Sequence, residues 1–159
     1  MKGKRAVGAA ALPTAPHDDN AQHEVQWRIT PKVEKPSVLS HKRNVYVVED
    51  DDAMAAHLAR VLKNYTVRTF SNGLDAIDAI DKKLPDVIIL DIILDGPSGF
   101  ALLNELQSYT DTGAVPVIVC SSMADELSEL LDDSVQVVLD KVTMTPNDVR
   151  EAVQKVLGG

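Results

Sequence analysis

The sequence has 159 residues and a mass of 17.2 kDa, which limits it to one domain of ordinary size and a modest appendage. Its net charge of −8 argues against a nucleic-acid-binding surface over the whole chain, so we expect no nucleic-acid partner. A single cysteine excludes a disulfide framework and a Cys-rich zinc site, and no apolar run approaches the roughly 20 residues of a membrane helix. We therefore expect a small cytoplasmic protein without membrane insertion.

The first 43 residues differ from the remainder in charge and composition. They carry eight Lys/Arg and four Asp/Glu, a net of +4, whereas residues 44–159 carry eight Lys/Arg and twenty Asp/Glu, a net of −12. They also hold four of the eight prolines and show no sustained periodicity. Because such a segment buries too little apolar surface to offset its ordering entropy, we expect residues 1–43 to form a disordered basic tail or linker and residues 44–159 to form the folded domain.

One segment of this tail, residues 24–30, has the spacing of a strand. Val25, Trp27 and Ile29 alternate there with polar residues. The pattern fits either an apolar patch within a linker or a segment that docks on another surface, and the sequence leaves both interpretations open.

The remaining sequence alternates between strand spacing and helix spacing. Apolar runs of strand length occur at residues 45–48, 65–70, 87–90, 115–120 and 135–139. The third and fourth runs are continuous, which is typical of parallel strands that are buried on both faces. Helical spacing of apolar residues follows each run, at residues 54–62, 74–80, 102–106, 127–131 and 149–157. This order predicts an α/β domain in three layers, with helices on both faces of a doubly wound five-stranded parallel sheet.

The last predicted helix has the clearest boundary signals. Thr145 precedes it as a candidate N-cap, Pro146 suits its first position, and Asp148 suits its first turn. Gly158 and Gly159 are expected to follow its end.

Chemically active side chains follow the ends of four predicted strands. The first and third strands end in carboxylates and the fourth and fifth lead into a hydroxyl and a lysine, namely Glu49, Asp50, Asp91, Ser121 and Lys141. Because ligands bind beyond the carboxyl ends of parallel strands, where the strand order reverses, we expect these side chains to meet at one edge of the sheet. Each residue alone also has a structural interpretation, as a helix cap, a turn residue or a solvated charge, and Asp51 and Asp52 are expected to be caps.

The combination of these groups indicates a metal-assisted reaction at phosphate. Three carboxylates within about 5 Å of one another repel by roughly 3 kcal/mol per pair at an effective dielectric constant of about 20, which requires a cation. Hard oxygen ligands in an open site favour Mg²⁺, which also binds phosphate oxygens. A metal ion, a carboxylate nucleophile, a lysine and a hydroxyl are the groups that phosphoryl transfer to an aspartate requires.

This part of the sequence resembles the receiver domain of two-component response regulators, in particular its single-domain, chemotaxis-regulator-like members. The resemblance covers residues 44–157 and rests on the segments VYVVEDD (45–51), PDVIILDIILDGPSGF (85–100), PVIVCSS (116–122) and LDK (139–141). It implies a flavodoxin-like fold with strand order 2-1-3-4-5 and a role in phosphorelay signal transduction.

The resemblance also implies a phosphoacceptor and a metal site. Asp91 occupies the position of the phosphoacceptor, and Glu49 and Asp50 occupy the positions of the acidic pair that binds Mg²⁺ together with Asp91. The main-chain carbonyl of Ile93 is implied as a further metal ligand.

The remaining roles and the partners follow from the same resemblance. Ser121 is implied as the hydroxyl that bonds the phosphoryl group, and Lys141 as the ion-pair partner of that group. The donor would be a histidine kinase or a histidine phosphotransfer protein, and the output would be contact with a downstream protein target. The chain would be a phosphoacceptor and not an enzyme, with at most self-catalysed phosphorylation and dephosphorylation.

Three features depart from the family pattern. Val142 stands where proline usually follows the lysine, and Val138 stands where the family often has an aromatic switch residue. The stretch from Ser121 to Lys141 is slightly shorter than usual, so we expect a short fourth helix. These departures leave the phosphorylation chemistry in place but put the usual output mechanism in question.

Two other functions stay open on the sequence alone. A degenerate receiver would act only as a phosphorylation-independent interaction module, although the family's site positions are intact. A phosphohydrolase with an aspartate nucleophile usually needs a second carboxylate two residues on, where this chain has Ile93 and where Asp95 lies too far along. Because nothing after Gly159 could form an output domain, we expect a single-domain receiver or a receiver excised from a longer chain.

Overall fold

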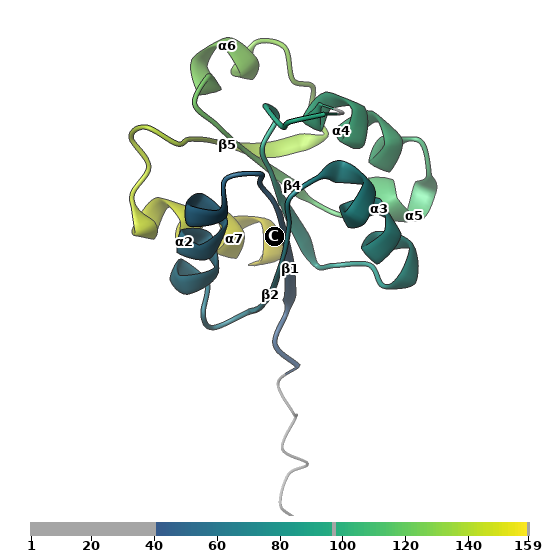
Figure 1. The fold of residues 1–159 in the computed structure, drawn as a ribbon, viewed down its shortest axis with the longest axis horizontal. Helices are drawn as coiled ribbons and strands as arrows, with labels where there is room; N and C mark the ends of the chain where they lie inside the picture. Colours follow the sequence, from purple (N-terminus) through teal and green to yellow (C-terminus); the bar gives the residue numbers. More distant parts are fainter. Residues whose placement is uncertain (1–40, 97, 159) are drawn as a thin grey trace, which may run out of the picture. The chain divides into compact units, whose positions relative to one another are not determined.

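The computed structural model describes residues 41–96 and 98–158 (Figure 1). In this part of the chain the elements are, in order, β1 (Asn44–Val48), α2 (Asp52–Val61), β2 (Thr66–Phe70), α3 (Gly73–Lys82), β3 (Val87–Leu90), α4 (Gly99–Gln107), α5 (Thr110–Gly113), β4 (Val117–Ser121), α6 (Ala124–Ser128), β5 (Val135–Asp140) and α7 (Pro146–Gly158). The expected tail lies outside the described residues except for 41–43, and its segment 24–30 lies wholly outside them. No helix among the described residues has the length and apolar character to cross a membrane.

The strands of the described part form one parallel sheet with the order β2-β1-β3-β4-β5. Val48 of β1 pairs with Phe70 on one side and with Leu90 on the other, so these three strands end at the same edge. Ser121 of β4 pairs with Asp140 of β5 close to that edge. The predicted fold class and strand order are confirmed.

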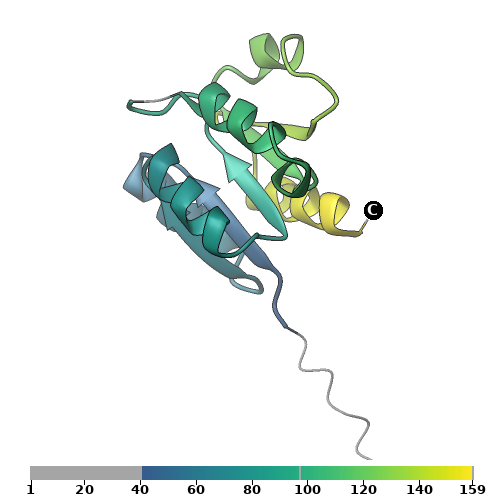
Figure 2. The same ribbon diagram turned by 90° about the vertical axis from the view of Figure 1, so that its right-hand side faces the viewer.

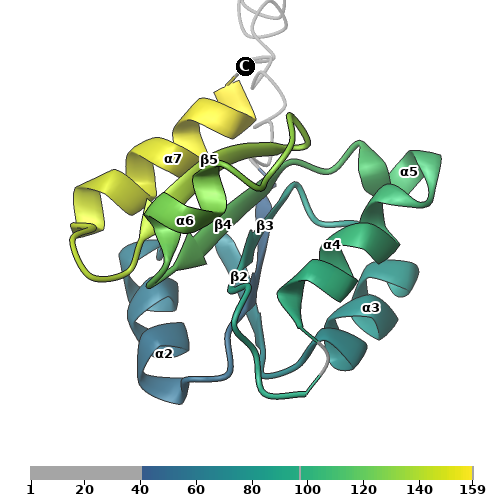
Figure 3. The same cartoon turned by 90° about the horizontal axis from the view of Figure 1, so that it is seen from above.

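Alternate residues of β1 face two different hydrophobic layers. Val45 and Val47 pack with residues of α2 and α7, whereas Tyr46 and Val48 pack with residues of α3 and α4. Figure 2 shows α3 and α4 side by side, and Figure 3 shows them on one side of the sheet with α2 and α7 on the other. The strands β3 and β4 are buried along their whole length, as their continuous apolar runs predict.

Side chains that follow the strands cap the helices. Asp51 Oδ1 accepts a hydrogen bond from the Met54 N–H at 2.7 Å, and Asn72 Oδ1 accepts one from the Asp75 N–H at 2.9 Å. Such caps satisfy backbone N–H groups that have no partner within the helix. Asp51 is therefore a cap, as predicted, and α2 begins directly beside the end of β1.

The structure corrects several helix predictions. Leu74, predicted on the buried face of its helix, is 64% exposed. The fourth predicted helix is short, as expected, but α6 ends at Ser128 instead of residue 131. Leu127 is the only buried residue of this helix, and Leu130 lies after the end of the helix and is 73% exposed. The sequence does not predict the one-turn helix α5, because four residues carry no apolar periodicity. Gly158 ends α7 and does not follow it.

Candidate functional site

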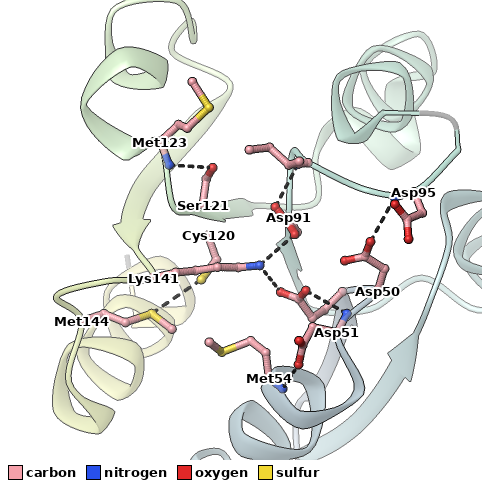
Figure 4. Close-up of polar contacts among 12 residues, drawn as sticks. Asp50, Asp51, Met54, Asp91, Asp95, Cys120, Ser121, Met123, Lys141 and Met144 are labelled. Carbon is pink, nitrogen blue, oxygen red and sulfur yellow. Dashed lines mark hydrogen bonds and ion pairs between the residues drawn. The ribbon is translucent and has the colours of Figure 1, made fainter.

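Three carboxylates from two neighbouring strands meet at the carboxyl edge of the sheet (Figure 4). Glu49 and Asp50 directly follow β1, and Asp91 directly follows β3. One ligand oxygen of each carboxylate lies within 4.8 Å of the others. Glu49 and Asp91 are buried, with 2% and 4% of their surfaces exposed, and Asp50 is half-buried. The structure thus brings together the three acidic residues that the sequence placed at one edge.

Lys141 lies between two of these carboxylates. Its Nζ atom is 2.8 Å from Asp91 Oδ2 and 2.5 Å from Glu49 Oε2. The lysine directly follows β5, and its backbone N–H donates to the Ser121 carbonyl at 3.0 Å, which holds the start of this turn against β4. A single ammonium group therefore bridges the ends of β1 and β3.

Burial and ion pairing set the protonation chemistry of this network. Burial raises the pKa of the Glu49 carboxyl, although hydrogen bonds from Lys141 and from the Asp51 N–H counteract the effect. Burial also acts to lower the pKa of Lys141, but hydrogen bonds to Asp91 and Glu49 outweigh it, so the pKa of Lys141 is raised. Lys141 therefore stays charged at neutral pH.

Backbone N–H groups orient the carboxylates. The Ile93 N–H donates to Asp91 Oδ1 at 2.9 Å, and the Asp95 N–H donates to Asp50 Oδ2 at 3.0 Å. The segment after β3 therefore contacts both strand ends. Ile93 lies in this segment and contacts the Asp91 carboxylate through its N–H, and the role of its carbonyl in metal binding stays a prediction.

Ser121 is the fully buried last residue of β4, the strand that pairs with β3. Its hydroxyl oxygen accepts a hydrogen bond from the Met123 N–H at 3.2 Å (Figure 4). A hydroxyl that accepts in this way keeps its own hydrogen available. The role of this hydroxyl as a donor to a phosphoryl group stays a prediction.

Gly99, the first residue of α4, supports the site and was missed by the sequence reasoning. A Cβ atom at this position would lie 2.3 Å from the Asp91 carbonyl oxygen and 2.6 Å from Ile92 Cα. The Gly99 N–H also donates to the Ile92 carbonyl at 2.9 Å. Only glycine permits such a close approach of the helix to the strand end. The signal in the sequence is a glycine directly after the N-cap Ser98, where helix propensity disfavours it.

The turn after β5 lacks the proline of the family pattern, and side-chain hydrogen bonds stabilise it instead. The Asp140 carboxylate accepts hydrogen bonds from the Val142 N–H at 2.8 Å and from the Thr143 hydroxyl at 3.0 Å. Val142 itself is 76% exposed, and Val138 is half-buried against the layer that includes α3 and α4. The side chain of Asp140 therefore supplies the local restraint on this turn.

Comparisons with known proteins agree on one family. The model for the response regulator receiver domain matches residues 45–154. The transcriptional regulatory protein CreB of Escherichia coli (strain K12) is 31% identical over 117 residues, which are 72% of this chain and 49% of CreB. The DNA-binding transcriptional regulator NtrC of the same strain is 33% identical over 114 residues, which are 70% of this chain and 24% of NtrC. The chain thus spans half or less of the length of these relatives.

One solved structure extends the likeness to three dimensions. The response regulator protein TrrA of Thermotoga maritima, in complex with Mg²⁺ and BeF, matches with a TM-score of 0.64 at 24% identity, over 72% of this chain and 99% of TrrA. At this identity the likeness shows the fold, and it agrees with the parallel sheet and the helix layers described above.

Proposed function

The chain belongs to the response regulator receiver domain family of two-component systems, and we propose that its Asp91 accepts a phosphoryl group from a histidine kinase or a histidine phosphotransfer protein. The observation that carries this proposal is the buried carboxylate of Asp91. Its two oxygens are held by the Ile93 N–H and by Lys141 Nζ, beside the carboxylates of Glu49 and Asp50. This is the arrangement of groups that phosphoryl transfer to an aspartate needs.

The acidic cluster fits a Mg²⁺ ion. Three carboxylate oxygens within 4.8 Å of one another offer the hard ligands that this ion prefers, and one of the three residues, Asp50, is only half-buried. We assign Glu49, Asp50, Asp91 and the main-chain carbonyl of Ile93 as its ligands. When bound, the ion would offset the negative charge of the phosphate as it approaches Asp91. The Mg²⁺–BeF complex of TrrA, a protein of the same fold, supports this assignment.

The chain's own residues carry the transfer itself. A carboxylate oxygen of Asp91 attacks the phosphorus, the new O–P bond forms as the P–N bond of the donor breaks, and the electron pair of that bond stays on the donor imidazole. Lys141 Nζ, already in contact with Asp91, compensates the charge on the phosphoryl oxygens, and the Ser121 hydroxyl donates to one of them. Ile93 supplies no carboxylate two residues after Asp91, which supports a phosphoacceptor over a phosphohydrolase.

The phosphorylated form would be read by a downstream protein. Residues 44–159 carry a net charge of −12, which supports a protein target over nucleic acid. NtrC is named as a DNA-binding regulator, but this chain spans 24% of its length, so the DNA binding of NtrC does not support a nucleic-acid partner for this chain. Contact with one protein would make the receiver a signalling intermediate without an activity of its own on other molecules.

Phosphoryl incorporation from acetyl phosphate tests the assignment. The wild-type chain should incorporate label with Mg²⁺ and lose this ability in EDTA, because the carboxylates then repel the phosphate. Asp91→Asn should abolish incorporation, since an amide is a poor nucleophile and a poor Mg²⁺ ligand. Asp95→Asn is the matched control, because this exposed carboxylate lies in the same segment, and it should retain incorporation.

Two results would contradict the proposal. Undiminished incorporation in Asp91→Asn would place the phosphoacceptor elsewhere. No incorporation in the wild-type chain, from acetyl phosphate or from a phosphorylated kinase in the presence of Mg²⁺, would favour the phosphorylation-independent interaction module.

A further inference from the structure

The side chain of Lys141 reaches past the end of a neighbouring strand to contact the site. β5 is the outermost strand on its side of the sheet, and β4 lies between it and β3. Because neighbouring strands are about 5 Å apart, roughly 10 Å separate the end of β5 from the end of β3. Lys141 nonetheless contacts Asp91, which follows β3, and Glu49, which follows β1. Over such a reach, a small change in backbone direction at Lys141 moves the ammonium group out of hydrogen-bond distance.

The backbone of Lys141 is held by a neighbouring strand on one side only. Its N–H donates to the Ser121 carbonyl of β4 at 3.0 Å, and no strand of the described part of the chain lies on the other side of β5. The next two residues, Val142 and Thr143, are exposed, so core packing does not hold them. The direction of the chain after Lys141 therefore depends on hydrogen bonds within the turn.

These hydrogen bonds converge on Asp140, the residue before the lysine. Its carboxylate accepts from the Val142 N–H at 2.8 Å and from the Thr143 hydroxyl at 3.0 Å, and its carbonyl accepts from the Met144 N–H at 2.8 Å. Asp140 itself belongs to β5 and is paired with β4. One side chain therefore joins the two residues that flank Lys141.

Met144 fixes the far end of the turn. The thiol of Cys120, which is buried in β4, contacts Met144 Sδ at 3.6 Å, and Met144 packs against the hydrophobic layer that includes α2 and α7. The turn is thus anchored at both ends, and the Asp140 carboxylate supports the exposed residues between them.

The Asp140 carboxylate does not belong to the acidic cluster of the site. In the described part of the chain, the carboxylates whose oxygens lie within 4.8 Å of one another are those of Glu49, Asp50 and Asp91. Both oxygens of Asp140 already accept hydrogen bonds from the turn. These contacts favour a link to Lys141 over a direct part in metal binding or in the chemistry.

We propose that Asp140 is a positioning residue, whose carboxylate fixes the turn 140–144 and thereby directs the ammonium group of Lys141 toward Asp91. The inference rests on the proposed phosphoryl transfer, because it deepens the role that Lys141 has there. Asp140 acts before the phosphoryl donor arrives. It restricts the conformations of the flexible lysine, so that less freedom is lost when the ammonium group meets the phosphoryl oxygens.

Initial rates of phosphoryl incorporation from acetyl phosphate, with Mg²⁺ and the full chain, test the proposal. Asp140→Ala removes both carboxylate acceptors and should lower the rate by roughly tenfold or more, because small displacements of a catalytic group have effects of this size. Asp140→Asn keeps an oxygen for the Val142 N–H and an amide that can donate to the Thr143 hydroxyl. It should therefore recover most of the rate, although it removes the same charge.

Asp132 offers a matched control just before β5. Its carboxylate accepts hydrogen bonds from the N–H of Ser134, at 3.0 Å, and from the hydroxyl of Ser134, so it supports a turn of the same kind at the opposite end of the strand. Asp132→Ala should leave the rate of incorporation unchanged. Urea unfolding of each variant separates a loss of stability from a loss of rate.

The same rates in a Lys141→Met background show whether Asp140 acts through the lysine. Adding Asp140→Ala to Lys141→Met should lower the rate by less than about twofold, because the group that Asp140 positions is already absent. Equal fold-losses in the two backgrounds would overturn the proposal. Wild-type rates in Asp140→Ala would also overturn it. Equal losses in Asp140→Asn and Asp140→Ala would do the same, since they would report the charge and not the turn.

Backbone ¹⁵N relaxation in the absence of Mg²⁺ gives a second readout that needs no phosphorylation. Order parameters of residues 141–144 should fall in Asp140→Ala and keep their wild-type values in Asp132→Ala. Unchanged order parameters in Asp140→Ala would overturn the proposal even if incorporation falls. Lower order parameters in a chain whose wild type incorporates no phosphoryl group would contradict the function proposed for Asp91 and leave the link between Asp140 and Lys141 standing.

Discussion

The position of Asp91 depends on its main chain as much as on its ion pair. Lys141 Nζ and the Ile93 N–H hold its two carboxylate oxygens, but Gly99 allows α4 to pack directly against the Asp91 carbonyl. A side chain at residue 99 would have to displace backbone atoms, which cannot rotate away as the end of a side chain can. The proposed phosphoacceptor is therefore positioned by a residue that lies outside the proposed reacting groups.

Gly99→Ala tests this dependence. The new Cβ has to displace the main chain of Asp91 or α4, so we expect the free energy of unfolding to fall by about 1–3 kcal/mol and phosphoryl incorporation to fall with it. Urea unfolding and incorporation from acetyl phosphate measure the two effects. Gly158→Ala is the matched control, because a Cβ there meets nothing within 4 Å, and it should not destabilise the protein. Equal stability of the two variants would contradict the close approach.

Among the elements, α7 begins at a reciprocal set of hydrogen bonds. The Thr145 N–H and hydroxyl donate to Asp148 Oδ2 at 2.7 and 2.8 Å, and the Asp148 N–H donates to the Thr145 hydroxyl oxygen at 3.2 Å. This is a capping box, in which two backbone N–H groups at the helix start are satisfied by side chains. The bonds from Thr145 hold the pKa of Asp148 below its usual value. The boundary signals of the sequence, Thr145 and Asp148, thus act together.

Asp148→Asn should lower stability at neutral pH and reduce the sensitivity of stability to acid. Because the folded state lowers the pKa of Asp148, its contribution is complete above the unfolded pKa of about 3.9 and is lost as the pH falls through the folded pKa. The difference in free energy of unfolding between wild type and variant should be constant above about pH 5 and shrink below about pH 4. Urea unfolding across this range measures it. Asp78→Asn, at an exposed position in the middle of α3, is the control. A difference that stays constant into acid would contradict the role of the carboxylate.

Across the whole domain, the site is linked to the surface of α6 and β5 by hydrogen bonds of Ser121. Its hydroxyl oxygen accepts from the Met123 N–H, just before α6, and its carbonyl accepts from the Lys141 N–H, just after β5. Val138 is short and β-branched, with a restricted side-chain torsion, so it cannot make the large swing of an aromatic residue. A signal from Asp91 would therefore pass through the segments after β4 and β5.

Beryllofluoride with Mg²⁺, standing in for the phosphoryl group, tests this route. We expect amide chemical shifts to change at residues 121–123 and 141–145, because Ser121 and Lys141 would form new contacts with the bound group and their present hydrogen bonds would adjust. Asp91→Asn should show none of these changes under the same additions. Changes confined to residues beside Asp91, with none at residues 123–145, would show that this surface does not respond.

The sequence by itself determined the order of the elements and the edge at which the site forms. Strand and helix spacing are local properties, and they placed five strands and the longer helices within a few residues of their observed positions. Each proposed ligand or phosphate-binding residue lies at a strand end or closely after one, as Ser121 ends β4, Asp91 follows β3 and Lys141 follows β5. A parallel sheet brings such positions together whatever the details of packing, so the convergence could be predicted.

Only the tertiary structure decided which of these groups touch and which apolar surfaces are covered. Lys141 bonds Glu49 as well as Asp91, and Gly99 contacts the main chain of Asp91, because strands and helices distant in sequence come within atomic contact. Leu74 has the helical spacing of a core residue but is exposed beside a groove between α3 and α4. Periodicity shows which side of a helix is apolar, whereas coverage of that side depends on the distance to a neighbouring helix, which no local pattern contains.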